Sequence, residues 1–318
     1  MENERKKIPL VKWQVPNKRV LYALIPPIVA SIYFFGWRSL LLLVVVCAAA
    51  YLTELVFVRS YYKEPVTSAV FVTAFLFTLS LPPTIPFWMA IVGIVFGVAI
   101  GKMAFGGYGR NIFNPALTGR AFIYVSFGAF MTSSWVEPFS GFPGGFTGFL
   151  SDATTKATPL TGGQAAGDAI SYLSLLFGNT SGSLGETSAL LLIIGGVYII
   201  WKKAANYRIV LSGFIGIVVL QTALWASGIE GALDPLRATL SGSFMLGIFF
   251  MATDPVSASQ TNPGRWIYGA LIGALISLIR TFSIWSEGVM FAILLGNMFN
   301  PILDYYIKQR KARRNPSE

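Results

Sequence analysis

The chain has 318 residues, of which 54% are hydrophobic and only 12% are charged, whereas soluble domains carry about a quarter charged residues. It contains no histidine and a single cysteine, Cys47. This excludes histidine-ligated haem or zinc, Ser-His-Asp catalysis, an internal disulfide and a protein-ligated iron–sulfur cluster. The formal charge of +10 comes from Lys and Arg at the ends of apolar blocks, as in the cytoplasmic loops of membrane proteins, which argues against a nucleic-acid partner.

The segment 1–19 is charged and is expected to be a retained cytoplasmic tail, because no small-residue cleavage site is evident. Ten apolar blocks follow it. Most of them are close to the ~20 residues that a helix needs to cross the ~30 Å core of a bilayer, although several are short. Helix is the default in lipid, so we expect an all-α polytopic membrane protein with about ten transmembrane helices. The blocks are residues 20–37, 39–58, 68–82, 86–105, 116–132, 187–201, 207–228, 239–253, 266–281 and 285–306.

The blocks group into a first helical repeat at 20–132 and a second at 187–307, each with about five helices. Basic residues lie in the N-terminal tail, after the second, fourth and sixth blocks, and in the C-terminal tail 308–318. With ten crossings they all face one side, which is expected to be cytoplasmic. The long segment 133–186 contains a single cation, Lys156, and is expected on the outer side. A loop of this length inside a compact bundle is usually functional or disordered.

Two short motifs recur along the chain. "NIFNP" at 111–115 returns as "NMFNP" at 297–301, and "EPVTSA" at 64–69 returns as "DPVSAS" at 254–259. The nearly equal offsets indicate internal duplication, which is common in transporter-like folds. An inverted repeat requires an odd number of crossings between equivalent points. "EPV" follows the second block and "DPV" the eighth, so the sequence leaves open whether the repeat is inverted.

The stretch "GGYGRNIFNPALTGRAF", residues 106–122, is expected to break a helix at membrane depth. Its glycines and proline free backbone groups, and Asn111 and Asn114 bring amides to the break. Such breaks are tolerated where they line a cavity, and the helix ends can hold polar ligands. A single copy is more simply explained as a helix cap with Asn before Pro. The second copy, with Asn297 and Asn300, favours a paired central site.

Seven ionisable residues near membrane depth are functional candidates by default. Most lie near block ends, where snorkelling or an interfacial location accounts for them. For Asp254, in "FMATDPVSA", and Arg120, in "LTGRAF", a functional role is favoured over that explanation. Cys47 lies in a run of Val and Ala and is expected to be a packed small hydrophobe. The seven candidates are Glu54, Lys102, Arg120, Asp254, Arg280, Glu287 and Asp304.

The segment 133–186 also holds the polar stretch "DATTKATPL" at 152–160. Together with "GRNIFNPALTGRAF", "FMATDPVSA" and "GRWIYG", this stretch makes nearly the whole chain resemble the NqrB/RnfD family of integral membrane flavoproteins. That family supplies one membrane component of the Rnf electron transport complex and one of the sodium-pumping NADH:quinone oxidoreductase. The lack of a long extension before the first block favours the RnfD type. The resemblance implies two bundles of about five helices, related by an inverted repeat of the urea-transporter type.

In this family, a flavin transferase attaches FMN to the last threonine of a pattern like D-x-x-[S/T]-G-A-T. Asp152, Thr155, Ala157 and Thr158 match the pattern, and Thr158 is the acceptor by position. Lys156 stands where the pattern has Gly or Ser. The threonine hydroxyl forms a phosphoester with the FMN phosphate, and the isoalloxazine ring carries out the redox chemistry.

The resemblance also implies non-covalent riboflavin at membrane depth. Arg120 is expected to pair with a flavin or phosphate oxygen. No catalytic residue and no metal ligand is expected in this chain itself. The expected cofactor-binding residues are Thr158, Asp152, Thr155, Ala157, Arg120, Asn111, Asn114, Asp254, Asn297 and Asn300.

The function implied is that of an electron-carrying subunit of an ion-translocating ferredoxin:NAD oxidoreductase (Rnf) complex, coupled to Na⁺ or H⁺ transport. The chain has no Gly-rich strand–turn–helix pattern for a dinucleotide and cannot ligate a cluster. Expected partners are therefore ferredoxin- and NADH-binding subunits, a second flavinylated subunit, membrane iron–sulfur subunits, the flavin transferase and the lipid bilayer. The expected location is the cytoplasmic (inner) membrane of a bacterium or archaeon, with both termini cytoplasmic.

Two other functions stay open on the residues alone. The repeated Asn-Phe-Asn-Pro elements suit a channel or carrier for a small polar solute, although such a channel has no need of "DATTKATPL". A purely structural membrane anchor for a redox complex is the weaker alternative.

Overall fold

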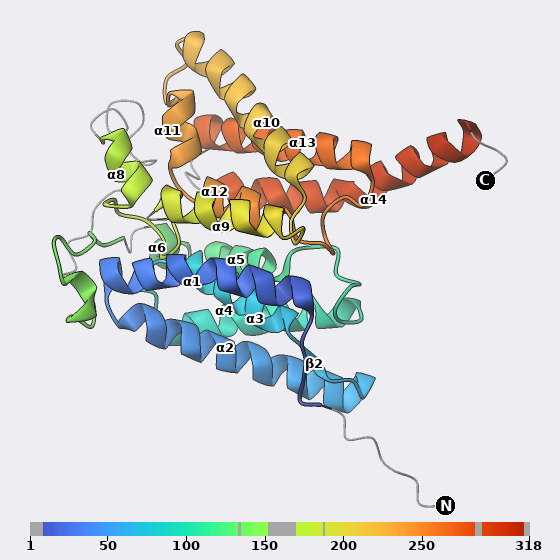
Figure 1. Ribbon diagram of the computed structural model, residues 1–318, viewed down its shortest axis with the longest axis horizontal. Coiled ribbons are helices and arrows are strands. Elements are labelled where there is room, and N and C mark those ends of the chain that lie inside the picture. Colours follow the sequence, from blue (N-terminus) through green and yellow to red (C-terminus); the bar gives the residue numbers. More distant parts are fainter. Residues whose placement is uncertain (1–8, 133–134, 152–169, 187, 284–287, 315–318) are drawn as a thin grey trace, which may run out of the picture.

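The protein is almost entirely helical in the computed structural model, which describes residues 9–132, 135–151, 170–186, 188–283 and 288–314 (Figure 1). Among the described residues, six helices are long and apolar enough to cross a membrane, and two shorter apolar helices accompany them. The expectation of an all-α polytopic membrane protein is confirmed. The six long segments are α1 (Val15–Phe35), α2 (Arg38–Phe57) with its π-helical extension η1 (Val58–Tyr62), α4 (Phe87–Ala99) with the turn η2 (Met103–Phe105), α10 (Tyr207–Ala226), α13 (Asn262–Phe282) and α14 (Gly288–Arg314).

Each of the ten apolar blocks contains helix, but four blocks form only short helices. Proline, glycine and polar residues interrupt them, as in "SLPPTIP" after α3 and in the glycines before α5. Gly106, Gly107 and Gly109 all have positive φ angles, which only glycine adopts without strain. The short segments are α3 (Ala69–Leu79), α5 (Pro115–Ser126), α9 (Ala189–Trp201) and α12 (Phe244–Leu246) with the π-helical η4 (Gly247–Met251). The smaller elements are β1 (Val11–Lys12), β2 (Val66–Thr67), α6 (Gly128–Thr132), η3 (Gly144–Phe146), α8 (Tyr172–Phe177) and α11 (Pro235–Leu240).

The helices form two groups that face each other. Helices α1 to α5 lie together in one group, and α9 to α14 form the other, with the short helices near the seam (Figure 1). Corresponding helices run in opposite directions: α1 against α9, α2 against α10, α4 against α13 and α5 against α14 (Figure 1). This is the arrangement of an inverted repeat. The residue boundaries of the two repeats, 20–132 and 187–307, stay a prediction.

The motif matches do not mark equivalent positions of this repeat. "NIFNP" leads into the start of α5, whereas "NMFNP" lies inside α14. "EPVT" precedes α3 and "DPVS" follows η4, and both lie at the end of the bundle where the chain termini are found (Figure 1). The even number of crossings between them is therefore no obstacle to inversion, because these two segments are not symmetry partners.

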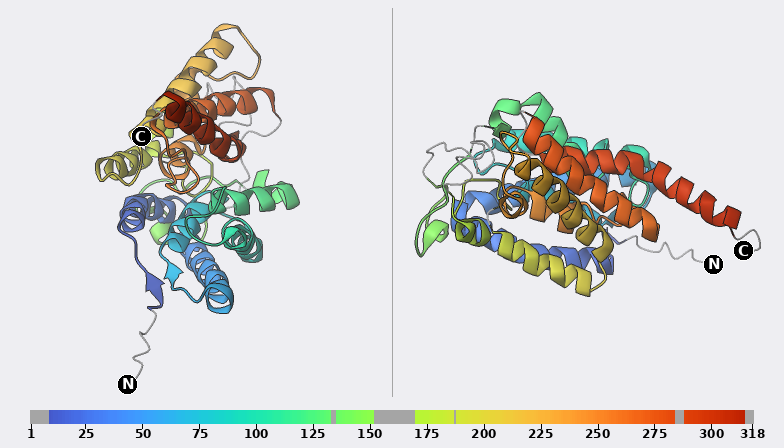
Figure 2. Two further views of the ribbon diagram at one scale, coloured as in Figure 1. Left: turned by 90° about the vertical axis from the view of Figure 1, so that its right-hand side faces the viewer. Right: turned by 90° about the horizontal axis from the view of Figure 1, so that it is seen from above.

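The described parts of the long connecting segment lie at the other end of the bundle, opposite the termini (Figures 1 and 2). Residues 135–151 are bound to the turn between α1 and α2, where the backbone N–H groups of Trp37 and Arg38 donate to the carbonyls of Gly148 and Phe149. Further on, the N–H of Gly185 donates to the carbonyl of Leu79 at 2.7 Å. Both described parts of the segment are thus anchored on the first group of helices.

Helices α10 and α13 pack closely along glycines. A Cβ on Gly216 would collide with the backbone of Ala270, and one on Gly273 would collide with the carbonyl of Gly213. Small residues at such contacts let two backbones approach, which is the main source of helix association in lipid.

Gly216→Ala is expected to destabilise the second group of helices by about 1–3 kcal/mol, since the backbone of Ala270 cannot move aside. The measurement is the Tm of the detergent-purified protein, which should fall. The matched control is Gly128→Ala, because a Cβ there meets nothing within 4 Å. An unchanged Tm for Gly216→Ala would contradict the close packing.

Candidate functional site

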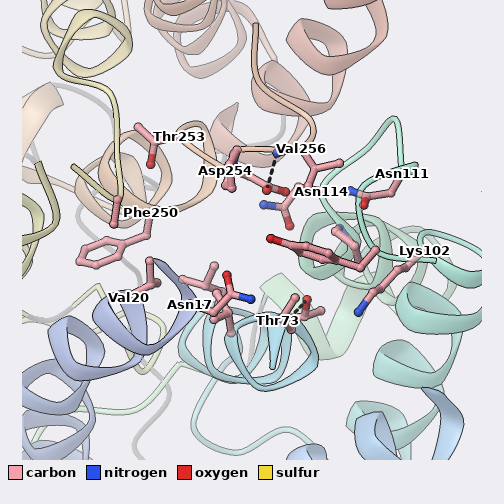
Figure 3. Close-up of a pocket in the computed structure, with 17 residues that line it drawn as sticks. Asn17, Val20, Thr73, Lys102, Asn111, Asn114, Phe250, Thr253, Asp254 and Val256 are labelled. Carbon is pink, nitrogen blue, oxygen red and sulfur yellow. Dashed lines mark hydrogen bonds between the residues drawn. The ribbon is translucent and has the colours of Figure 1, made fainter. Parts of the chain in front are cut away.

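A cavity lies on the seam between the two groups of helices (Figure 3). Asn17 and Ala69, near the starts of α1 and α3, line it, so it lies at the end of the bundle where the chain enters α1. The space inside it that a water-sized sphere can enter is about 60 Å³, well below the ~300–1,000 Å³ typical of small-molecule sites. Polar side chains from both groups line it among apolar ones. The polar lining residues are Asn17, Thr73, Lys102, Tyr108, Asn111, Asn114, Thr253 and Asp254, and the apolar ones include Val20, Val72, Leu76 and Phe250.

Asn114 is both a helix cap and part of this cavity. Its side-chain Oδ1 accepts from the N–H groups of Ala116 and Leu117 at 3.0 and 3.4 Å, and Pro115 occupies the first position of α5. Its Nδ2 donates to the carbonyl of Met251 at 3.2 Å, at the end of η4 in the other group. Asn114 therefore caps α5 and also lines the cavity, while its part in a paired central binding site stays a prediction.

The two Asn-x-Phe-Asn-Pro motifs meet directly. The backbone N–H of Asn114 donates to Oδ1 of Asn297 at 3.1 Å, and Asn297 is completely buried. Its Nδ2 donates to the hydroxyl of Tyr268 at 2.7 Å and to the carbonyl of Ser257 at 3.3 Å, and Nδ2 of Asn300 donates to the same carbonyl. Asn297 and Asn300 stand behind the cavity rather than in its wall. They fix Asn114 and the segment after Asp254.

Asp254 reaches the cavity from the turn after η4. Its Oδ1 accepts from the N–H of Val256 at 3.0 Å, shown dashed in Figure 3, and its Oδ2 accepts from the hydroxyl of Ser257 at 3.2 Å. Burial raises the pKa of the Asp254 carboxyl, while these two hydrogen bonds and the charge of Lys102 act against that rise. Burial also raises the pKa of Tyr108, and the nearby Asp254 charge adds to the rise.

A buried ion pair supports one wall of the cavity. Nζ of Lys102 lies 2.6 Å from Oε2 of Glu54 and donates to the hydroxyl of Thr67 at 2.9 Å. The N–H and hydroxyl of Thr67 donate in turn to Oε1 of Glu54. Glu54 and Lys102 are each 1% exposed, so neither side chain snorkels to solvent, and their depth in the membrane stays a prediction.

The N-terminal segment brings another residue that the sequence did not single out. β1 pairs in parallel with β2, and the Ser68 hydroxyl donates to Oε1 of Gln14 at 2.6 Å. Asn17 donates to Oε1 of Gln14 as well, at 2.9 Å, and its side chain lines the cavity. Asn17 is a polar residue in the first turn of an apolar helix, and this was the only sign in the sequence that it could have a role. That it lies beside α3 is seen only in the folded structure.

Arg120 lies away from the cavity wall. It is 1% exposed, and its Nε donates to the carbonyl of Ser80 at 2.8 Å, at the end of α3. The expected pairing of Arg120 with a flavin or phosphate oxygen stays a prediction. Asp152, Thr155, Ala157 and Thr158 lie outside the described residues, as does Glu287.

Two other candidates have structural partners. Asp304, on α14, accepts from the hydroxyls of Ser259 and Thr261 and from the N–H of Gln260, so it holds the turn that leads into α13. Arg280 donates to the carbonyls of Ala238 and Ser241 near the far end of the bundle. Neither residue lines the cavity.

A second hollow adjoins the cavity. The two share Ala204, Thr253, Asp254 and Pro255 as lining residues. The second hollow is bordered by the exposed residues Trp201 and Gln260 and by Lys203. The cavity on the seam is thus continuous with the surface at the terminus end of the bundle.

Comparison with known proteins places the chain in a family. Residues 12–313 match the model of the NQR2, RnfD, RnfE family. Three relatives are each named as the B subunit of Na(+)-translocating NADH-quinone reductase. The one from Ectopseudomonas mendocina (strain ymp) is 42% identical over 262 residues, the one from Yersinia pestis 42% over 265, and the one from Haemophilus influenzae (strain PittEE) 41% over 268.

Each alignment covers 79% of this chain but only 62% or 63% of the relative. The chain therefore spans less than two thirds of the length of these relatives. The family match covers nearly all of the chain, including both Asn-x-Phe-Asn-Pro motifs and the cavity beside them. This polytopic membrane protein belongs to the NQR2, RnfD, RnfE family.

Proposed function

We propose that this chain is a flavin-carrying membrane subunit of an ion-translocating oxidoreductase, and more closely of an Rnf-type ferredoxin:NAD oxidoreductase coupled to Na⁺ or H⁺ transport. The observation that carries the proposal is the cavity on the seam, built in a member of this family from Asn111, Asn114 and Asp254. The relatives named above are subunits of a Na⁺-translocating NADH-quinone reductase by name, which supports the wider activity class.

We place riboflavin across the cavity and the adjoining hollow, whose volumes are about 60 and 500 Å³. Apolar side chains such as Val72 and Phe250 offer surfaces for a flat heteroaromatic ring, and the amides of Asn17, Asn111 and Asn114 supply donors and acceptors for its polar edge. The carboxylate of Asp254 accepts hydrogen bonds from sugar-alcohol hydroxyls. When bound, the ring supplies electron transfer, and this chain's residues bind and orient it.

FMN belongs, in this proposal, on Thr158. The segment that contains Thr158 follows Ser151, whose hydroxyl donates to the carbonyl of Glu137 at 2.7 Å, and it comes before the part of the chain bound to α3. Both anchors lie at the end of the bundle opposite the cavity (Figures 1 and 2). In this proposal, FMN on Thr158 and riboflavin at the seam give electrons two stations in this chain.

Binding of ferredoxin and NADH and electron transfer through iron–sulfur clusters require other subunits in this proposal. We propose partners that bind ferredoxin and NADH, a second flavinylated subunit and membrane iron–sulfur subunits, with a flavin transferase for the attachment. The termini, with their Lys and Arg residues, face the cytoplasm on this proposal, and the segment at 133–186 faces the outside.

Thr158→Ala is expected to abolish the covalent flavin. The protein, made in cells that contain the transferase, is denatured on a gel and examined for ultraviolet fluorescence, and the peptide with Thr158 is weighed by mass spectrometry. The control is Thr154→Ala, a threonine that the attachment pattern does not require. A bare peptide from the unaltered protein would remove the covalent part of the proposal.

Ala204→Trp is expected to cut the riboflavin that acid releases from the purified protein to less than a tenth, because the indole fills the space of the cavity. Ala204 lines the cavity and the adjoining hollow, whereas Ala205 lines the hollow alone, so Ala205→Trp is the matched control. Equal riboflavin in the two variants would show that the flavin sits elsewhere.

Single cysteines test the orientation in the membrane. In a Cys47→Ser background, Ser140→Cys should react with an impermeant maleimide in intact cells, and Ala312→Cys should react only after the cells are opened. Both native residues are exposed in the fold, at opposite ends of the bundle. The reverse pattern would invert the proposed topology.

A further inference from the structure

Residues 139–149, "FSGFPGGFTGF", form an aromatic segment at the end of the bundle opposite the termini, where the ribbon is green in Figure 1. Glu137 is the one charged residue between 135 and 151. Three phenylalanine rings of the aromatic segment lie on the surface: Phe142 is 89% exposed, Phe149 58% and Phe146 38%. An exposed apolar patch of this kind marks a contact with a membrane or with another protein.

The aromatic segment is fixed on the turn between α1 and α2. Besides the two backbone hydrogen bonds from this turn described above, the indole N–H of Trp37 donates to the carbonyl of Phe146 at 2.7 Å. A Cβ on Gly145 would collide with the carbonyl of Ile32, so the two backbones are in direct contact there. The exposed rings are therefore held at a fixed height relative to the ends of α1 and α2.

That height is the height of the bilayer interface. α1 has 21 residues and is therefore roughly 31 Å long, which matches the ~30 Å hydrocarbon core of a bilayer. Trp37 follows its end by two residues, so the turn that holds the aromatic segment lies where the hydrocarbon ends and the headgroups begin. Tryptophan is enriched at this level of membrane proteins.

The aromatic segment is continuous with a lipid-facing surface. Trp37, Leu41, Val44, Leu52 and Val56 are all exposed, and their spacing places them along one face of α2. In a membrane-spanning helix, such an apolar exposed face contacts acyl chains. Its first residue, Trp37, is the one whose indole binds the aromatic segment, so the exposed rings extend this face toward the headgroups.

The backbone of the aromatic segment suits a water-poor environment, because protein groups satisfy much of it. The carbonyl of Gly141 accepts from the hydroxyl of Tyr33 at 3.2 Å, and the N–H of Phe139 donates to the carbonyl of Phe34 at 2.8 Å. Pro143 has no N–H to satisfy. The rings can therefore enter lipid without exposing these backbone groups to it.

We propose that the aromatic segment is an interfacial membrane anchor, in which Phe142, Phe146 and Phe149 enter the boundary between the headgroups and the acyl chains. This lipid contact does not depend on a redox role for the chain. The attachment pattern that we propose for FMN begins directly after Ser151. The anchor thus holds Ser151, the residue from which that part of the chain leaves, at the bilayer surface.

The test measures the depth of position 142 in a bilayer. The full-length protein, in a Cys47→Ser background, is reconstituted into nanodiscs of phosphatidylethanolamine and phosphatidylglycerol, and a nitroxide is attached to Phe142→Cys. Electron paramagnetic resonance then gives the collision rates of the nitroxide with oxygen, which concentrates in lipid, and with a water-soluble nickel complex.

Two matched positions calibrate the measurement. Val44→Cys reports the lipid-facing side of α2, because the native side chain is exposed on that face. Glu230→Cys reports water, because Glu230 is an exposed carboxylate in the turn between α10 and α11. α10 ends at the same end of the bundle as the aromatic segment (Figure 1).

The ratio of oxygen to nickel collisions at Phe142→Cys is expected to exceed that at Glu230→Cys about threefold or more and to stay below that at Val44→Cys, since the ring lies between water and hydrocarbon. Phe149→Cys should give a similar ratio and serves as a second, independent position. Ratios at both positions equal to that at Glu230→Cys would place the aromatic segment in water and overturn the inference. Low collision rates with both reagents would show that a second copy of the chain covers the segment, which also overturns it.

Discussion

Lipid offers no partners for the backbone groups that a broken helix leaves free, so this fold depends on side chains that satisfy them from within. At the seam that task falls to asparagine. Asn114 covers the first N–H groups of α5, and Asn297 accepts from the backbone of Asn114. Losing one such buried partner leaves a donor or acceptor unsatisfied, at a cost of about 1–3 kcal/mol. The same bonds fix the two groups of helices against each other, and that fixed seam gives the cavity its walls.

The same constraint explains why the chain contains two similar motifs at positions that an inverted repeat does not relate. "NIFNP" ends a loop and starts α5, while "NMFNP" lies inside α14, where Pro301 cannot donate to the carbonyl of Asn297. Both motifs deliver amides to one seam from helices that run in opposite directions. Their likeness therefore reflects a shared chemical task at one place, whereas the true repeat is visible only in the directions of the helices.

Much of the fold and part of the candidate site could be predicted from the sequence. The ten blocks, the break before α5 and a central pairing of the Asn motifs follow from hydrophobicity and from Pro and Gly positions. The residues that line the cavity could not be predicted, because Asn17, Thr73 and Lys102 come from three segments that are far apart in the sequence. Glu54 and Lys102 lie near the ends of apolar blocks, which is typical of interfacial charges. They are buried because β1 and β2 fold over that end of the bundle and bring Thr67 to both of them. The hydrophobic periodicity of the sequence does not predict that β1 and β2 bury these two side chains.

The buried ionisable side chains follow the same constraint as the backbone. Glu54 and Lys102 form a pair that is neutral as a whole, and Thr67 adds hydrogen bonds to both of them. Removing one partner of a buried ion pair costs about 3–5 kcal/mol, because the other charge is then left uncompensated. The two side chains therefore stabilise this end of the bundle only as a pair.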